Sequence, residues 1–161
     1  MAPRSSLPLQ LAIWVQGHLT RVLVVVLLSL LIIKPYFLNY PEGIAQGEFF
    51  FVLLHPLVQS IRSWLGTAGN KQERASFIAG FLWLTMWTAL TTGYFWRRQA
   101  FGLKFECWLA AAGVGLAGLE SVLALLAGMS FCDGLRDVLH VTAAFGASGL
   151  CFLIVYWRFA A

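Results

Sequence analysis

The chain has 161 residues, of which 60% are apolar or aromatic and only 11% are charged. Soluble domains carry about 25% charged residues, and disordered chains combine low hydrophobicity with high charge, so both classes are excluded. The net charge of +4 comes from scattered basic residues rather than from the basic stripe that nucleic acid requires. The composition therefore predicts an all-α, polytopic integral membrane protein whose surroundings are the lipid bilayer and not a nucleic acid.

The first 20 residues are expected to form a cytoplasmic or interfacial segment, followed by a first membrane span over residues 22–40. The uninterrupted apolar run covers only residues 22–33, which is shorter than the roughly 20 residues needed to cross a bilayer. The span is therefore expected to continue past Lys34, whose amine would reach towards the interface, and past Pro35, which would form a kink. We interpret this segment as an uncleaved span rather than a signal peptide.

Residues 41–74 are predicted to form an outer loop that contains one interfacial amphipathic helix over residues 56–65. Pro56 suits a first helical turn and Gly66 suits a stop, while Leu57, Ile61 and Trp64 share one face. Such a helix is expected to lie on the outer membrane surface. The alternative is a short re-entrant segment over residues 49–58, which is too short to cross.

Three further spans are predicted over residues 75–96, 105–129 and 138–157, which completes a bundle of four transmembrane helices in a single membrane domain. They are joined by an inner loop over residues 97–104 and an outer loop over residues 130–137. The inner loop carries Arg97, Arg98 and Lys104, and short basic loops face the cytoplasm. We therefore expect a multi-pass protein of the cell (inner or plasma) membrane with both termini cytoplasmic.

Small residues indicate how the last two spans would pack. Ala111 and Gly115 in one span, and Ala143 and Ala147 in the next, form pairs of small residues four apart. Small side chains allow helix backbones to approach closely in lipid. The pattern predicts a tight antiparallel pair between residues 105–129 and 138–157.

Glu120 is the most informative single residue, because it lies inside a predicted span. A carboxylate at that depth costs about 2.5–3.5 kcal/mol on insertion scales for aspartate. Its helical neighbours are mostly small, so Glu120 is expected to point into the bundle. Two interpretations remain open: a structural, protonated carboxyl bonded to Thr85, Thr88, Thr91 or Ser148, or a catalytic group.

A second polar cluster opens the last span. Asp137 and His140 are three residues apart and share a helix face, so they join Glu120 as candidate catalytic residues, although Asp137 would also suit a helix cap. The basic residues Lys71, Arg74 and Arg136 are candidate ligand-binding residues. No metal-ligand spacing or cofactor motif appears, so neither a metal nor a cofactor is expected.

These residues resemble the pattern of the VanZ-like family of small membrane proteins, over about residues 70–150. Asn70 and Lys71 would correspond to the acid and lysine before the family's second span, and Arg74 to its histidine. Glu120, Arg136, Asp137 and Gly146 would take the family's later positions, whereas Leu123 replaces its glutamine. The resemblance implies a cell-envelope protein linked to glycopeptide-resistance settings.

The leading functional hypothesis is a non-enzymatic membrane protein that acts through assembly, as an accessory subunit of a complex or as a homo-oligomer. The span over residues 75–96 is expected to expose an apolar face that could dock a partner, although lipid contact explains it equally well; this face comprises Phe81, Trp83, Leu84, Trp87 and Phe95. One alternative is a VanZ-like envelope protein that binds or processes a lipid or glycolipid head group at the outer interface. Another is a channel or proton-coupled transporter that uses Glu120.

Overall fold

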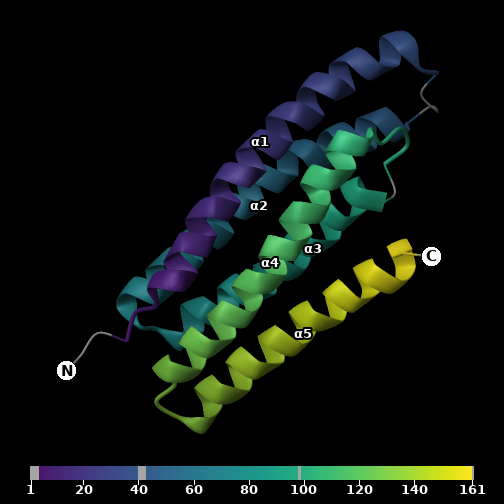
Figure 1. The fold of residues 1–161 in the computed structure, drawn as a ribbon. Coiled ribbons are helices and arrows are strands. Elements are labelled where there is room, and N and C mark those ends of the chain that lie inside the picture. Colours follow the sequence, from purple (N-terminus) through teal and green to yellow (C-terminus); the bar gives the residue numbers. More distant parts are fainter. Residues whose placement is uncertain (1–3, 40–42, 98, 161) are drawn as a thin grey trace.

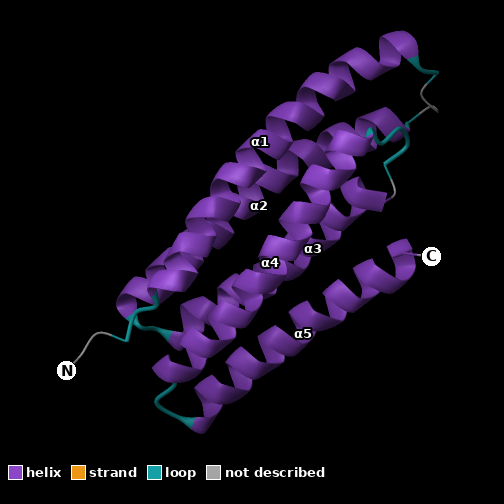
Figure 2. Ribbon diagram, viewed as in Figure 1, coloured by secondary structure: helices purple, strands orange, loops and turns teal. Residues whose placement is uncertain are grey.

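The computed structural model describes residues 4–39, 43–97 and 99–160, and within these ranges the chain folds into five helices. They are α1 (Leu7–Phe37), α2 (Ile44–Gln72), α3 (Ala75–Arg97), α4 (Lys104–Phe131) and α5 (Leu135–Ala160). Figure 1 shows them as an elongated bundle in which successive helices run in opposite directions, and Figure 2 shows no strand in the described ranges. All five are long and apolar enough to cross a membrane. The prediction of a helical membrane protein is confirmed, whereas the count of four spans is wrong.

Helix α1 is one continuous element rather than a surface segment followed by a span. It begins after Ser6, whose hydroxyl accepts a hydrogen bond from the Leu9 amide at 3.4 Å. The buried face repeats every three or four residues and runs from Leu9 through Gln16 and Thr20 to Lys34. Polar residues on this buried face lower the local hydropathy. For this reason the sequence predicted a surface segment over residues 1–20 and not the first part of a span. Lys34 is buried, so the expectation that its amine reaches the interface is also wrong.

Helix α2 replaces the predicted loop with its interfacial helix at residues 56–65. Its buried stripe alternates steps of four and three residues, comprising Glu48, Val52, His55, Gln59, Arg62, Gly66 and Gly69. The apolar side chains of Leu57, Ile61 and Trp64 are exposed instead. The polar side of this helix therefore faces the bundle and its apolar side faces outward, the opposite of a helix in a soluble protein. The reason is that in lipid only the interior of the protein offers hydrogen-bond partners. Pro56 lies inside this helix and does not begin it.

Helix α3 is the central element and packs against α2, α4 and α5. Helix α5 makes most of its contacts with α3 and few with α4, so the predicted tight pair between the last two spans is wrong. A side chain built at Gly115 would meet nothing within 4 Å, which shows that this small-residue stripe faces outward. The bounds of α3, α4 and α5 otherwise agree with the predicted spans to within a few residues.

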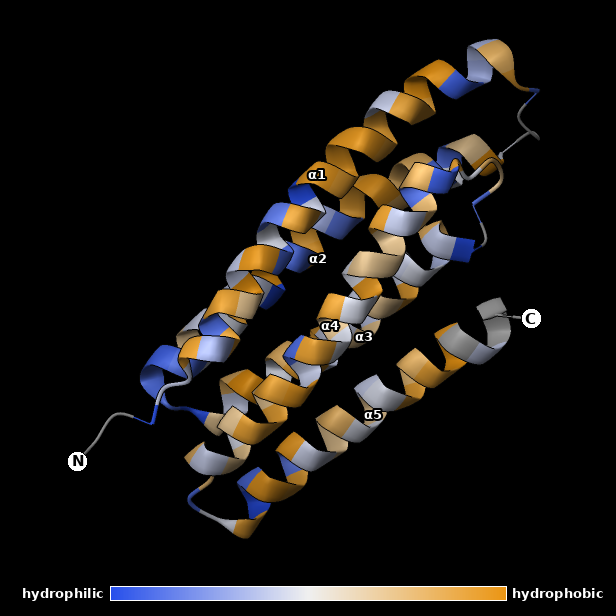
Figure 3. Cartoon of the chain, viewed as in Figure 1, coloured by the Kyte–Doolittle hydropathy of each residue, from blue (hydrophilic) through white to orange (hydrophobic). Residues whose placement is uncertain are grey.

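The alternating direction of the helices defines two ends of the bundle. The N-terminal end holds the start of α1, the α2–α3 turn and the α4–α5 turn, and the far end holds the other two connections. Figure 1 places the two chain termini at opposite ends, which an odd number of crossings requires. If all five helices cross the bilayer, the two termini lie on opposite sides of it, whereas the sequence predicted both in the cytoplasm. Figure 3 shows hydrophilic positions recurring along α1 and α2 between their ends, where a span is usually apolar.

Candidate functional site

Glu120 lies on α4 at the centre of the bundle and is completely buried. Its inward orientation confirms the sequence prediction, but its partner is Arg62 of α2 and not a hydroxyl alone. Arg62 Nη2 donates to Glu120 Oε2, and both side chains are at most 1% exposed. The sequence had assigned Arg62 to an outer loop, so the central feature of the site was missed.

The other two nitrogens of Arg62 each donate a hydrogen bond as well. Its Nε donates to Thr85 Oγ1 of α3 at 2.9 Å, and its Nη1 donates to Gln59 Oε1 at 3.1 Å. The guanidinium carbon lies 4.5 Å from the centroid of the Phe81 ring, an additional cation–π contact. One arginine thus joins α2, α3 and α4, and its charge is compensated within the chain.

Glu120 is less completely bonded than its partner. Its Oε1 atom has no hydrogen-bond partner among the described residues. Thr85, one of the hydroxyls predicted to bond Glu120, bonds Arg62 instead and donates its own proton to the Phe81 carbonyl at 2.8 Å. The arrangement is a buried ion pair held by one arginine, which ties helices together, and Glu120 is not among the residues that line the groove between α1 and α2.

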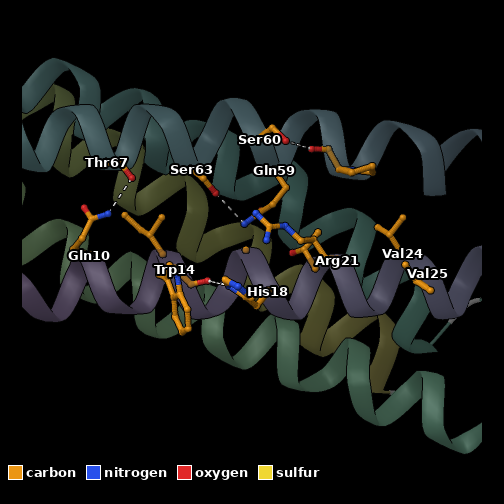
Figure 4. A pocket seen from close by; sticks show the side chains of 14 residues that line it. Gln10, Trp14, His18, Arg21, Val24, Val25, Gln59, Ser60, Ser63 and Thr67 are labelled. Atoms are coloured by element: carbon orange, nitrogen blue, oxygen red, sulfur yellow. Dashed lines mark hydrogen bonds between the residues drawn. The ribbon is translucent and has the colours of Figure 1, made fainter.

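The Arg62 network reaches the surface through Gln59. Gln59 Nε2 makes a long contact of 3.5 Å to Ser63 Oγ, and both residues line a groove of about 680 Å³ between α1 and α2. Figure 4 shows this groove, with His18 and Arg21 of α1 opposite Gln59 and Ser63 of α2. The polar interior of the bundle is therefore open on the side of the α1–α2 groove.

A second buried ion pair lies at the far end of the bundle. Lys34 Nζ of α1 donates to Glu106 Oε1 at 2.8 Å and to Oε2 at 2.6 Å. Glu106 also accepts from the Leu103 amide at 2.8 Å, so its charge caps the first turn of α4. The sequence predicted that the Lys34 amine reaches towards the interface, whereas Lys34 pairs with Glu106 and so joins α1 to α4.

Helices α2 and α3 are linked by two further polar contacts. His55 Nδ1 lies 2.9 Å from Thr91 Oγ1, and both are buried. Glu48 Oε1 accepts from the Ala100 amide at 2.8 Å and from the Tyr94 hydroxyl at 3.3 Å. The signal that could have located all of these residues is the spacing of polar side chains along α2, which matches a buried helical stripe.

The other predicted site residues lie at the N-terminal end of the bundle. Lys71, Arg74, Arg136 and His140 are exposed, and Asp137 is partly buried in the first turn of α5. Arg74 lies 6.0 Å from the Phe77 ring centroid. None of these side chains contacts Glu120, so the three predicted catalytic candidates do not converge on one site. Among the described residues no cluster of three histidine, cysteine or carboxylate side chains is placed to hold a metal ion.

The same end contains contacts that the sequence did not indicate. Asn70 and Ser6 exchange two hydrogen bonds of 2.8 Å between the amide side chain and the Ser6 backbone. The Arg4 amide donates to Glu73 at 2.6 Å, and its guanidinium lies 3.9 Å from Asp133. Burial raises the pKa of the Cys132 thiol, and the carboxylates of Asp137 and Asp133 raise it further. These contacts fasten the start of α1 to the turns beside it.

The fold and its buried ion pairs define a polytopic helical membrane protein whose intramembrane charges serve to hold its helices together. The chain belongs to the Transmemb_17 family, described as predicted membrane protein, whose model matches residues 12–117. That match covers Lys34, Arg62 and Glu106 and ends three residues before Glu120. It overturns the resemblance to the VanZ-like family and the cell-envelope setting that this resemblance implied.

Curated relatives agree with the family assignment. The chain is similar to transmembrane protein 216 of Homo sapiens, Rattus norvegicus and Mus musculus, with 26% identity over 130 residues in each case. The alignment spans 78% of this chain and 90–92% of the relatives. No solved structure matches the chain. The names of these relatives state a membrane protein and nothing further.

Proposed function

We propose that this chain is a non-enzymatic membrane protein that acts through assembly, as an accessory subunit of a membrane complex or as a homo-oligomer. The observation that supports the proposal is that the buried ionisable side chains pair with one another inside the chain. Arg62 with Glu120 and Lys34 with Glu106 form buried pairs between helices, and ionisable side chains at that depth otherwise tend to serve a ligand or an ion. Here they stabilise the helix arrangement and leave the outer faces of the bundle for recognition.

The shape of the molecule supports the same proposal. The connections between the helices comprise only residues 38–43, 73–74, 98–103 and 132–134, so most of the surface is helix within the membrane. Of the face predicted to dock a partner, Trp83 and Trp87 are half exposed, whereas Phe81 and Phe95 are buried and belong to the core. A partner would therefore contact this protein mainly inside the bilayer, where small and polar residues direct helix association.

The test is the assembly state in native membranes. The tagged chain is crosslinked in the membrane, extracted in a gentle detergent and measured by native mass spectrometry. We expect a species heavier than the 17.8 kDa monomer, at multiples of that mass for a homo-oligomer and at other masses for a subunit of a complex. A monomer in both the crosslinked and the uncrosslinked samples, with no accompanying protein, would refute the proposal.

The topology belongs to this proposal as well. We place all five helices across the bilayer, so that epitope tags at the two ends of the chain are reached from opposite sides of a sealed membrane vesicle. Protease protection of each tag measures this, and tags protected on the same side would refute five crossings. The cell membrane as location and the cytoplasmic N-terminus stay predictions from the sequence.

A further inference from the structure

Arg21 is a charged side chain at the middle of a span that faces outward. It lies 14 residues after the start of α1 at Leu7 and 16 before its end at Phe37, which corresponds to about 21 and 24 Å of helix rise. Its side chain is exposed and makes no hydrogen bond or ion pair with the described residues. The buried bases Lys34 and Arg62 each have a carboxylate within the chain, whereas Arg21 has none.

The surroundings of Arg21 are polar but contain no acid. The groove between α1 and α2 is lined by His18 and Arg21 from one helix and by Gln59, Ser60, Ser63 and Thr67 from the other, and no aspartate or glutamate is among the residues that line it. Figure 4 shows Gln59 and Ser63 of α2 and Arg21 of α1 facing one another across the groove. The groove thus offers a positive charge and several hydrogen-bonding groups, and it lacks a negative charge.

An arginine near the middle of a membrane-crossing helix is far from bulk water at either end of that helix. The bilayer core is about 30 Å thick, so each interface lies about 15 Å from the midplane, which is farther than an arginine side chain extends. Intramembrane charges face the bundle, a cavity or a partner group because lipid does not solvate them. Because the described residues offer Arg21 no acid, a carboxylate supplied from outside this chain at a similar depth would compensate its charge.

We propose that the α1–α2 groove is the binding site for a transmembrane helix of a different protein, one that carries an aspartate or glutamate near its middle and pairs it with Arg21. This inference rests on the proposed function and names the chemistry of the partner. Ser60, Ser63 and Gly17 give the groove small walls, which allow a helix to approach closely.

Two other occupants fit the groove less well. A second copy of this chain has only one acid at mid-span, Glu120, which is buried against Arg62, and Glu48 and Glu106 lie buried near the far end. The phosphate of an anionic lipid lies at the interface, about 15 Å from the midplane, and therefore away from Arg21. Depth and charge together favour a carboxylate on a partner helix.

The test uses the full chain in lipid nanodiscs with a synthetic peptide as the probe. The peptide is a helix of about 20 leucine and alanine residues with lysines at its ends and one central glutamate, and a matched peptide carries leucine at that position. Association is measured by energy transfer between labels on the chain and the peptide. We expect the glutamate peptide to bind about tenfold more tightly than the leucine peptide.

Matched variants of the chain assign the effect to Arg21. Arg21→Leu is expected to remove the preference for glutamate, and Arg21→Glu is expected to prefer a peptide with a central lysine. Arg136→Leu changes an exposed arginine outside the groove and should leave the preference intact. Circular dichroism of each variant confirms that it is folded.

Three results would overturn the assignment: equal binding of the two peptides, a glutamate preference that survives Arg21→Leu, or displacement of the glutamate peptide by phosphatidylglycerol in the nanodisc. The last would indicate an anionic lipid as the occupant. A native complex whose composition is unaffected by Arg21→Leu, together with no glutamate preference, would refute this inference and leave the proposed function standing. If the chain prefers the glutamate peptide but is monomeric in native membranes, the proposed function is refuted and the binding site at Arg21 stands.

Discussion

Two arginines near the middle of their helices, Arg62 and Arg21, differ in how their charge is compensated. Arg62 points into the bundle and has a carboxylate, a hydroxyl, an amide oxygen and an aromatic ring around it. Arg21 points into an open groove and has no acid within that groove. The comparison teaches that the helix face, and not the charge itself, decides whether an intramembrane arginine serves the fold or is left for a partner.

The largest expected effect is on the inward arginine. Arg62→Leu leaves Glu120 buried without its cation, and breaking a buried ion pair in this way costs about 3–5 kcal/mol of unfolding free energy. The measurement is reversible unfolding in mixed micelles with increasing dodecyl sulfate. The double variant Arg62→Leu, Glu120→Leu removes both charges and should recover much of the loss. A single variant as stable as the unmodified chain would contradict the structural role of the pair.

This ion pair also shows what the sequence could and could not predict. Glu120 was expected to point inward from its small helical neighbours, and it does. Its partner was missed because a window of hydropathy over α2 averages Glu48, His55 and Arg62 with the apolar residues between them, and so lowers the score of a genuine span. The positions of these polar residues, in steps of three and four, are consistent only with one buried helical face.

The later helices were predictable for the opposite reason. Helices α3, α4 and α5 have few charges inside the apolar run, so length and hydropathy alone find them. Their neighbours were not predictable, because small residues such as Gly115 mark any lipid-exposed or packed face, and only tertiary structure shows that α5 lies against α3. The site residues were not predicted where contacts between distant parts of the chain, such as that of Lys34 with Glu106, decide which residues are buried.

The ion pair of Lys34 with Glu106, at the far end of the bundle, provides a second test of an inward-facing charge. Glu106→Gln removes the charge that Lys34 and the Leu103 amide both contact, and hydrogen bonds to charged groups contribute about 1.5–3 kcal/mol. We expect a loss in that range, below that of Arg62→Leu because glutamine still accepts a hydrogen bond. Lys104→Met, an exposed lysine two residues away, is the control and should change little. Equal losses in both variants would contradict the pairing.

Two glycines provide a test of packing that does not involve charge. A methyl group at Gly66 would lie 2.7 Å from the Phe81 ring and 2.8 Å from Ile13, and overpacking of this kind costs about 1–3 kcal/mol. Gly66→Ala should therefore destabilise the region that holds Arg62. A methyl group at Gly115 would meet no atom within 4 Å, so Gly115→Ala should be neutral or should stabilise the fold by up to about 1 kcal/mol. The same unfolding titration measures both, and a reversed order would contradict the placement of α2 inside the bundle.

The smallest expected effect on stability is that of the outward arginine. Arg21 has an exposed side chain and no hydrogen-bond or ion-pair partner to lose among the described residues, so Arg21→Leu should shift the unfolding free energy of the isolated chain by no more than about 0.5 kcal/mol. A loss of several kcal/mol would mean that Arg21 is satisfied within the fold, as Arg62 is, and the contrast between the two residues would disappear. Stability unchanged in the isolated chain, combined with weaker association in the membrane, is the result that separates a residue kept for a partner from one kept for the fold.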